Sequence, residues 1–261
     1  MSRLGRAFEL VRGRTGLIPF LTAGYPSLDA SLELMRRFDR AGVRAIELGI
    51  PFSDPIADGA EIQRASEWAV SHGVGMLDAL ELVRAFRRDS TTPVVVMTYA
   101  NPIVRLGPER FAELAAGVGV DAVLISDLPV DESPALWAAM DAARLDTITL
   151  VAPTTPPARL PEILARCRGF VYCLARTGVT GRSSGFVGAL PERIAGLRAA
   201  SRLPIAVGFG ISSPQDARAL RGQVDAVIVG AAFMRAIAED PGQDAVERAV
   251  ALAQGMIAAL D

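Results

Sequence analysis

Two carboxylic acids, Glu47 and Asp58, have the type and placement to move protons. Glu47 lies near the end of a short apolar run, residues 45–48, where its carboxyl is expected to be poorly hydrated. Poor hydration raises the pKa of a carboxyl toward the range that suits proton transfer at neutral pH. Asp58 belongs to the stretch that follows, which Pro51 and Pro55 stiffen. The pattern favours a rigid catalytic loop, although a buried, ion-paired glutamate followed by turn-forming aspartates has the same appearance.

Glycine-rich turns late in the chain have the composition of an anion site. They occupy residues 176–181, 208–212 and 230–232. A glycine that ends a strand and opens a helix lets backbone N–H groups converge on a phosphate. Glycine also closes tight turns for steric reasons alone, so a single turn is weak evidence. Two such turns after neighbouring apolar runs favour a phosphorylated ligand.

The residue types that are missing limit the chemistry further. All 27 basic residues are arginine, so the chain has no lysine for an imine, a covalently held pyridoxal phosphate or a P-loop. One histidine, His72, and two cysteines, Cys167 and Cys173, do not form a structural zinc pattern, so no metal is expected. The two cysteines fit a reducing cytoplasm. We therefore expect an enzyme that works with carboxylates, hydroxyls and backbone amides.

Charge and hydropathy exclude several classes of protein. The formal charge of −2 gives no basic footprint for nucleic acid. No apolar run approaches 18 residues, so no transmembrane helix is expected. The first residues mix charges into their apolar positions and do not resemble a secretory signal. We expect a cytoplasmic protein.

The elements that must position these residues follow a regular rhythm. Eight short apolar runs read as strands buried on both faces. These are residues 16–21, 45–48, 93–97, 122–125, 147–151, 170–174, 205–207 and 226–229. Helical patterns fall between and after them, at residues 28–40, 76–88, 108–116, 131–143, 157–166, 191–200 and 243–260, with an extra one at 4–12 before the first strand. Four residues have the type and place of a helix cap: Ser27, Asp131, Thr155 and Ser213.

Eight strands with following helices in 261 residues predict an α/β fold, a (β/α)8 TIM barrel with an extra N-terminal helix. The rival is a doubly wound sheet, which usually shows a glycine fingerprint after its first strand; the residues after the first run lack it. No linker divides the chain, so residues 1–261 are expected to form a single domain. In a barrel, function lies where strands end and the loops that follow them begin.

Several segments, in this order and spacing, resemble the tryptophan synthase α-subunit family. They are IELGIPFSDPIADG followed by Ile62-Gln63, then YANP, RTGVTG and VGFGIS. The resemblance covers essentially the whole chain. It implies a lyase that cleaves indole-3-glycerol phosphate to indole and D-glyceraldehyde 3-phosphate, without a cofactor of its own. It also implies an α2β2 complex in which a β subunit, carrying pyridoxal phosphate, receives the indole through a tunnel and makes L-tryptophan.

The resemblance also assigns site residues. Glu47 and Asp58 match the family's two catalytic acids, and Tyr172 matches a tyrosine near them. Phe20 matches a position that packs against indole, although core packing is the default for both rings on composition alone. The substrate-binding positions that remain are matched by Thr180, Gly181, Gly210, Gly230 and Ala231.

This assignment agrees with the residue inventory. A retro-aldol cleavage normally needs a lysine imine or a metal, but indole accepts the electrons itself once C3 is protonated. We expect Glu47 to carry protons between C3 and the C3′ hydroxyl, and Asp58 to accept the hydrogen bond of the indole N–H. Two departures from the family pattern stand out. Ala60-Glu61 adds a charge near the catalytic loop, and Ala231 replaces a serine at the phosphate site.

Other functions compete with this interpretation. A free-standing lyase would release indole without a partner. A non-catalytic barrel would act only as an allosteric partner, and the presence of both Glu47 and Asp58 speaks against it. Another phosphate-binding barrel, an isomerase or the synthase of indole-3-glycerol phosphate, is a further alternative; the synthase uses a catalytic lysine that this chain lacks.

Overall fold

The structure is a computed structural model that describes residues 2–175, 190–208, 210–239 and 244–261. Within these residues, parallel strands pair in chain order, and the last pairs with the first to close a barrel. The strands are β1 (Gly16–Thr22), β2 (Ile46–Gly49), β3 (Val94–Thr98), β4 (Ala122–Ile125), β5 (Asp146–Val151), β6 (Val171–Leu174), β7 (Ile205–Gly208) and β8 (Ala226–Val229). Each coincides with a predicted run to within one residue at either end. The (β/α)8 barrel is confirmed, and the doubly wound alternative is wrong.

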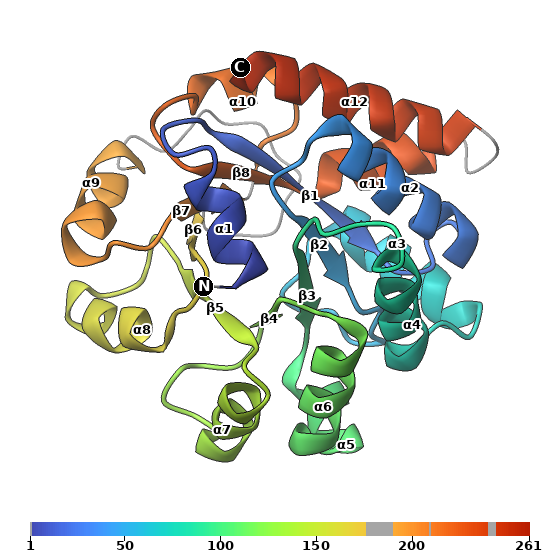
Figure 1. Ribbon diagram of the computed structural model, residues 1–261, viewed down its shortest axis with the longest axis horizontal. Helices are drawn as coiled ribbons and strands as arrows, with labels where there is room; N and C mark the ends of the chain where they lie inside the picture. Colours follow the sequence, from blue (N-terminus) through green and yellow to red (C-terminus); the bar gives the residue numbers. More distant parts are fainter. Residues whose placement is uncertain (1, 176–189, 209, 240–243) are drawn as a thin grey trace.

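Helices surround the barrel (Figure 1). They are α2 (Leu28–Ala41), α3 (Ala60–Ser71), α4 (Met76–Phe86), α5 (Ala100–Leu106), α6 (Pro108–Val118), α7 (Pro134–Ala142), α8 (Leu160–Arg166), α9 (Leu190–Ala200), α10 (Pro214–Ala219), α11 (Ala231–Ala238) and α12 (Asp244–Leu260), with a 3-10 turn, η1 (Pro157–Arg159), before α8. Among the described helices, none is long and apolar enough to cross a membrane.

The extra N-terminal helix, α1 (Arg3–Glu9), lies across one end of the barrel instead of in the outer ring (Figure 1). Its Leu4 and Phe8 are buried among residues of the barrel interior. Arg3 donates to Asp121, which lies just before β4, at 2.6 Å. The amino-terminal end of the barrel is therefore closed, and the opposite end, where the strands finish, is left for a site.

Local sequence signals explain some helix starts and not others. Ser27 and Ser213 cap α2 and α10 with their side chains, as predicted. Asp131 does not cap α7, which begins at Pro134; instead it forms an ion pair with Arg159. Thr155 accepts from a preceding backbone N–H and caps no helix. Helices α3 and α5 were not predicted, because both lie in the loops that follow strands, outside the regular strand–helix rhythm.

Alternation along the strands places particular residues inside the barrel. Glu47 on β2 and Ala45 directly before that strand face inward, and on β1 Ile18 and Phe20 do so. The interior below Glu47 is apolar, since its buried cluster consists of Leu4, Phe8, Ile18, Ala45, Val95, Ala122, Leu124, Ile148, Phe170, Tyr172, Ala206, Ala226 and Ile228. Glu47 thus places a carboxyl directly next to the apolar interior of the barrel.

Candidate active site

Glu47 is fully enclosed at the carboxyl end of β2. The residue is 2% exposed, and among the described residues its Oε1 is buried without a hydrogen-bond partner. Burial, helped by the negative charge of nearby Asp58, raises the pKa of the Glu47 carboxyl to about 8. At neutral pH this carboxyl is mostly protonated, and it can donate a proton without first having to acquire one.

The loop between β2 and α3 is held rigidly by α3. The Gln63 side chain donates to the carbonyls of Pro55 and Asp58, at 3.2 and 3.0 Å. The Ser66 hydroxyl both accepts from the N–H of Phe52 and donates to its carbonyl. These bonds fix the loop from both sides and place Asp58, which is buried, at the mouth of the barrel.

Tyr99, directly after β3, orients Asp58. Its hydroxyl donates to Asp58 Oδ2 at 2.9 Å and accepts from the N–H of Ala57 at 3.1 Å. Burial raises the pKa of Asp58 to about 6, while the Tyr99 hydrogen bond works against that rise. Burial and the Asp58 charge raise the pKa of Tyr99, so it remains a donor. The sequence marks Tyr99 only weakly, as a residue that follows a strand and shares the inward face with Val95 and Met97.

Tyr172 lies on β6 with its ring inside the barrel. Burial, followed by the charges of Glu47 and Asp58, raises the pKa of Tyr172 well above its usual value. The three side chains are therefore within electrostatic reach of one another. On the neighbouring strand, a Cβ at Gly208 would lie 2.6 Å from Tyr172 Cε1. The absence of a side chain at Gly208 makes room for the phenol ring.

Phe20 is packed against the glycines of both flanking strands. A Cβ at Gly49 would lie 2.6 Å from Phe20 Cζ, and a Cβ at Gly230 would lie 3.4 Å from Phe20 Cβ. Ile62 of α3 also contacts the Gly230 position, at 3.3 Å. Phe20 and Ile62 thus pack side by side at the end of β8.

The ends of β7 and β8 are adjacent, because Gly208 pairs with Ile228. Helix α11 begins at Ala231 with Gly230 as its N-cap and has no side-chain cap. Phe233 and Met234 donate their N–H groups to the Gly230 carbonyl, whereas the N–H groups of Ala231 and Ala232 have no acceptor within the helix. After β7, Asp216 accepts from the N–H groups of Ser212 and Ser213, so α10 caps itself. Gly210, in the same turn, has a φ of +91°.

Residues 8–260 match the sequence family described as "Tryptophan synthase alpha chain". The chain is 45% identical over 261 residues to the tryptophan synthase alpha chain of Chromobacterium violaceum, covering 100% of both. It is 44% identical to that of Ralstonia nicotianae, covering 95% of this chain and 94% of the relative. The chain belongs to the tryptophan synthase alpha chain family.

Solved structures of this family have the same fold. A chain of Mycobacterium tuberculosis tryptophan synthase superposes with a TM-score of 0.91 at 38% identity, over 99% of this chain and 98% of that one. The tryptophan synthase subunit alpha of Legionella pneumophila gives 0.89 at 35% identity, over 100% and 99%. Like its family, the chain is a lyase that cleaves indole-3-glycerol phosphate to indole and D-glyceraldehyde 3-phosphate. Alpha chains need no cofactor, since pyridoxal phosphate belongs to the β subunit.

Part of the expected alpha-chain site lies outside the described residues. Thr180 and Gly181, and with them the 177–188 stretch, belong to this part. Within the described residues, no group of histidine, cysteine, aspartate and glutamate could hold a metal ion. His72 follows the last residue of α3 and stacks on Trp68. Cys167 and Cys173 are buried free thiols.

The two departures from the alpha-chain pattern differ in consequence. Glu61 lies in the first turn of α3 and forms an ion pair with Arg64 at 3.1 Å, which offsets the extra charge beside the loop. Ala60 is the first residue of the same helix. Ala231 occupies the corresponding position in α11, where backbone N–H groups remain whatever the side chain.

Proposed function

We propose that Glu47 and Asp58 divide the proton work of indole-3-glycerol phosphate cleavage. The observation that carries the proposal is their split titration, with pKa values of about 8 for Glu47 and about 6 for Asp58. Near pH 7, Glu47 is mostly protonated and Asp58 mostly ionised. Two carboxyls with separated pKa values can act as acid and base in one site.

Glu47 first donates its proton to C3 of the indole ring, which gives an indolenine cation. The resulting carboxylate then accepts the proton of the C3′ hydroxyl. As that O–H bond breaks, the C3′ oxygen forms the aldehyde carbonyl. The electrons of the C3–C3′ bond pass into the ring and restore the indole. One proton leaves Glu47 and one returns, so the group is ready for the next turnover.

Asp58 stabilises the charge that develops on the ring nitrogen. Its carboxylate accepts the hydrogen bond of the indole N–H, which strengthens when the ring becomes cationic. The Tyr99 hydrogen bond supports this role, because it holds Asp58 in one orientation and favours its ionised form. Tyr172 closes the apolar chamber beside the two acids.

The phosphate group anchors the other end of the substrate. We assign it to the backbone at Gly210, Gly230 and Ala231, together with Gly181, and Thr180 to substrate contact. Support comes from the uncapped start of α11 and the left-handed turn at Gly210 on the adjacent strand. Phe20 lies between this end and the acids, where the indole ring would pack.

We further propose that the β subunit docks on the face formed by the loops after β2 and β3, in an α2β2 assembly through which indole passes by a tunnel. Support comes from two large apolar side chains exposed there, Ile56 in the catalytic loop and Val104 on α5, at 80% and 59%. Asp58 lies in the first of these loops and is bonded to Tyr99 of the second and to Gln63 of α3, so docking bears directly on the acid. The buried free cysteines support a cytoplasmic location, which fractionation of cells tests.

The experiment is indole release from indole-3-glycerol phosphate by Asp58→Asn and by Asp54→Asn. Asp54 lies in the same loop but is exposed and bonded to Ser53. Loss of Asp58 is expected to lower the rate by roughly 10²–10⁴-fold, whereas Asp54→Asn stays within a few-fold of wild type. Equal rates for the two variants would contradict the assignment of Asp58.

A further inference from the structure

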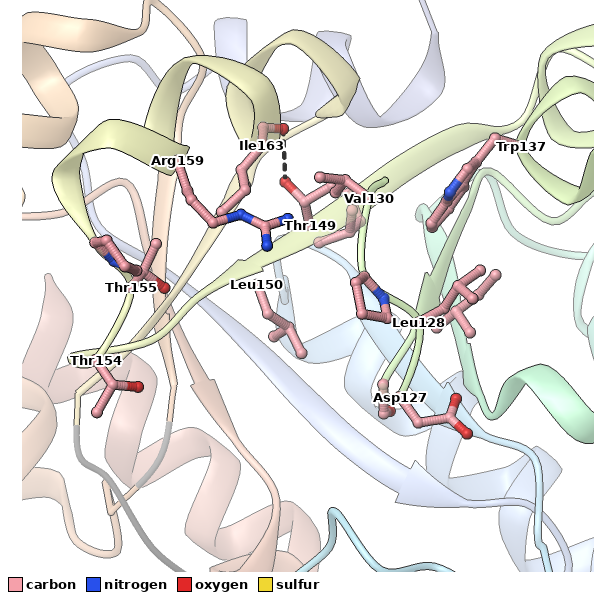
Figure 2. Close-up of a pocket in the computed structure, with 15 residues that line it drawn as sticks. Asp127, Leu128, Val130, Trp137, Thr149, Leu150, Thr154, Thr155, Arg159 and Ile163 are labelled. Carbon is pink, nitrogen blue, oxygen red and sulfur yellow. Dashed lines mark hydrogen bonds between the residues drawn. The ribbon is translucent and has the colours of Figure 1, made fainter. Parts of the chain in front are cut away.

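A second pocket lies between the carboxyl ends of β4 and β5 (Figure 2). The two strands pair only as far as Leu124 and Ile148, yet β5 continues to Val151. β4 itself ends at Ile125, and residues of α7, η1 and α8 complete the lining beyond it. The resulting pocket has a volume of about 470 Å³. Neither Glu47 nor Asp58 lines it.

The walls of this pocket are mainly apolar. Six aliphatic side chains line it: Ile125, Leu128, Val130, Ile148, Leu150 and Ile163. Its volume is within the range of about 300–1,000 Å³ that is usual for small-molecule sites. The apolar part of the lining therefore suits the flat or branched apolar body of a small ligand.

Two hydrogen-bonding groups in the lining are buried and unused. Trp137 is 5% exposed, and neither its Nε1 nor the Ser126 Oγ has a hydrogen-bond partner among the described residues. Leaving such donors unpaired is unfavourable, so both would gain from an acceptor. Trp137 is held in place by the Arg166 guanidinium, 5.2 Å from the ring centroid. Its side chain points from α7 toward Leu128 and Val130 (Figure 2).

The pocket also contains a positive charge. Figure 2 shows the Arg159 side chain extending from η1 over the pocket, toward Thr149 and Leu150. Its Nη2 forms ion pairs with Asp131 at 2.7 Å and with Glu162 at 3.6 Å. The carboxylate of Asp127 lies at the opposite end of the view and accepts from the N–H of Ala100. The Arg159 end is therefore the one suited to an anionic group.

We propose that this pocket is a second binding site, distinct from the catalytic one, for a small carboxylate with a flat apolar body. The apolar walls take the body of the ligand. The carboxylate of the ligand lies at Arg159, and the body runs toward Trp137.

The chain contains a reporter for this site. Its two tryptophans are Trp68 and Trp137. Trp68 is partly exposed on α3, so Trp68→Phe leaves Trp137 as the sole emitter and a probe of the pocket. In the full chain with this background, 3-phenylpropionate is expected to change Trp137 emission saturably. Its uncharged amide, 3-phenylpropanamide, is expected to bind more weakly.

Substituting Arg159 and Asp131 in turn shows whether ligand binding needs the Arg159 cation or only the ion pair between the two residues. Arg159→Gln is expected to weaken 3-phenylpropionate binding about tenfold, while Asp131→Asn retains the cation and the binding. Indole release is expected to be unchanged in both variants, since neither residue touches the catalytic acids. No saturable change at millimolar ligand, equal binding of acid and amide, or equal binding by Arg159→Gln and wild type would each overturn the proposal. Competition by glyceraldehyde 3-phosphate would place the ligand in the catalytic site and would overturn it as well.

Discussion

The Tyr99 hydroxyl donates a hydrogen bond to Asp58 Oδ2 at 2.9 Å, joining the loop after β3 to the catalytic loop after β2. The same hydroxyl accepts from the N–H of Ala57, so one side chain fixes both the carboxylate and the backbone beside it. Tyr99 therefore positions a catalytic acid and need not touch the substrate to matter.

Tyr99→Phe is expected to impair catalysis through Asp58. The ring keeps its contact with Phe52, at 5.2 Å between centroids, but the hydrogen bond that lowers the pKa of Asp58 is lost. The pKa of Asp58 then rises, and the acidic limb of the pH profile of kcat/KM moves to higher pH. The rate near neutral pH should fall roughly tenfold, the size expected for a hydrogen bond to a charged group.

The pH profile of wild-type indole release is the control. It should be bell-shaped, with limbs from Asp58 near pH 6 and Glu47 near pH 8. A Tyr99→Phe profile that falls in height but keeps its acidic limb would show that the hydroxyl does not tune Asp58.

The burial of Glu47 is expected to cost stability as the pH rises. Its folded pKa of about 8 lies above its ordinary value of 4.5, so the folded state binds more protons than the unfolded state between these values. The contribution of Glu47 to the free energy of unfolding is therefore greatest below pH 4.5. This contribution is lost as the pH rises to about 8. Glu47→Gln removes this effect.

Urea unfolding of wild type and Glu47→Gln at several pH values measures the effect. Relative to wild type, the free energy of unfolding of Glu47→Gln should increase by a few kcal/mol between acidic and alkaline pH. A difference in unfolding free energy that does not vary with pH would mean that Glu47 titrates normally in the folded chain.

Gly208→Ala is expected to displace Tyr172, because the added Cβ would lie 2.6 Å from its ring. Overpacking of this kind costs about 1–3 kcal/mol and should reduce activity through the shifted phenol. Gly196→Ala on α9 is the matched control, since nothing lies within 4 Å of its new Cβ. Urea unfolding and indole release measure both changes; similar results for the two variants would argue against close packing at Tyr172.

Ile56→Glu is expected to weaken docking of the β subunit while leaving the free chain active. Ile56 is exposed and makes no contribution to the buried site. The Ile56→Glu chain should therefore have normal activity alone, but a higher concentration of β subunit should be needed to stimulate it. Titration of the β subunit against a fixed amount of the chain measures this; an unchanged half-saturation point would move the interface elsewhere. Leu10→Glu, directly after α1 at the opposite end of the barrel, provides an exposed apolar control.

Much of the barrel could be predicted from the sequence, because its strands are buried on both faces and appear as uninterrupted apolar runs. The run at 122–125 became β4 without change. Helices α3 and α5 could not be found in this way, since they break the strand–helix rhythm. The cap expected at Asp131 was wrong because a distant residue, Arg159, takes its carboxylate.

The site residues likewise differ in how far they could be predicted from the sequence. Glu47 could be predicted because an acid inside an apolar strand is conspicuous on its own. The dependence of Asp58 on Tyr99 could not, since the two are 41 residues apart and meet only when neighbouring strands align. Likewise, Glu61 looked like an uncompensated charge until α3 placed Arg64 one turn away.

The most direct test of the account is indole release from indole-3-glycerol phosphate by Glu47→Gln, with and without the β subunit. A buried amide of the same shape cannot donate a proton to C3, so the rate should fall by roughly 10²–10⁴-fold in both conditions, with the variant still folded by circular dichroism. A folded Glu47→Gln chain whose rate stays within a few-fold of wild type would contradict the assignment of Glu47 as the proton carrier.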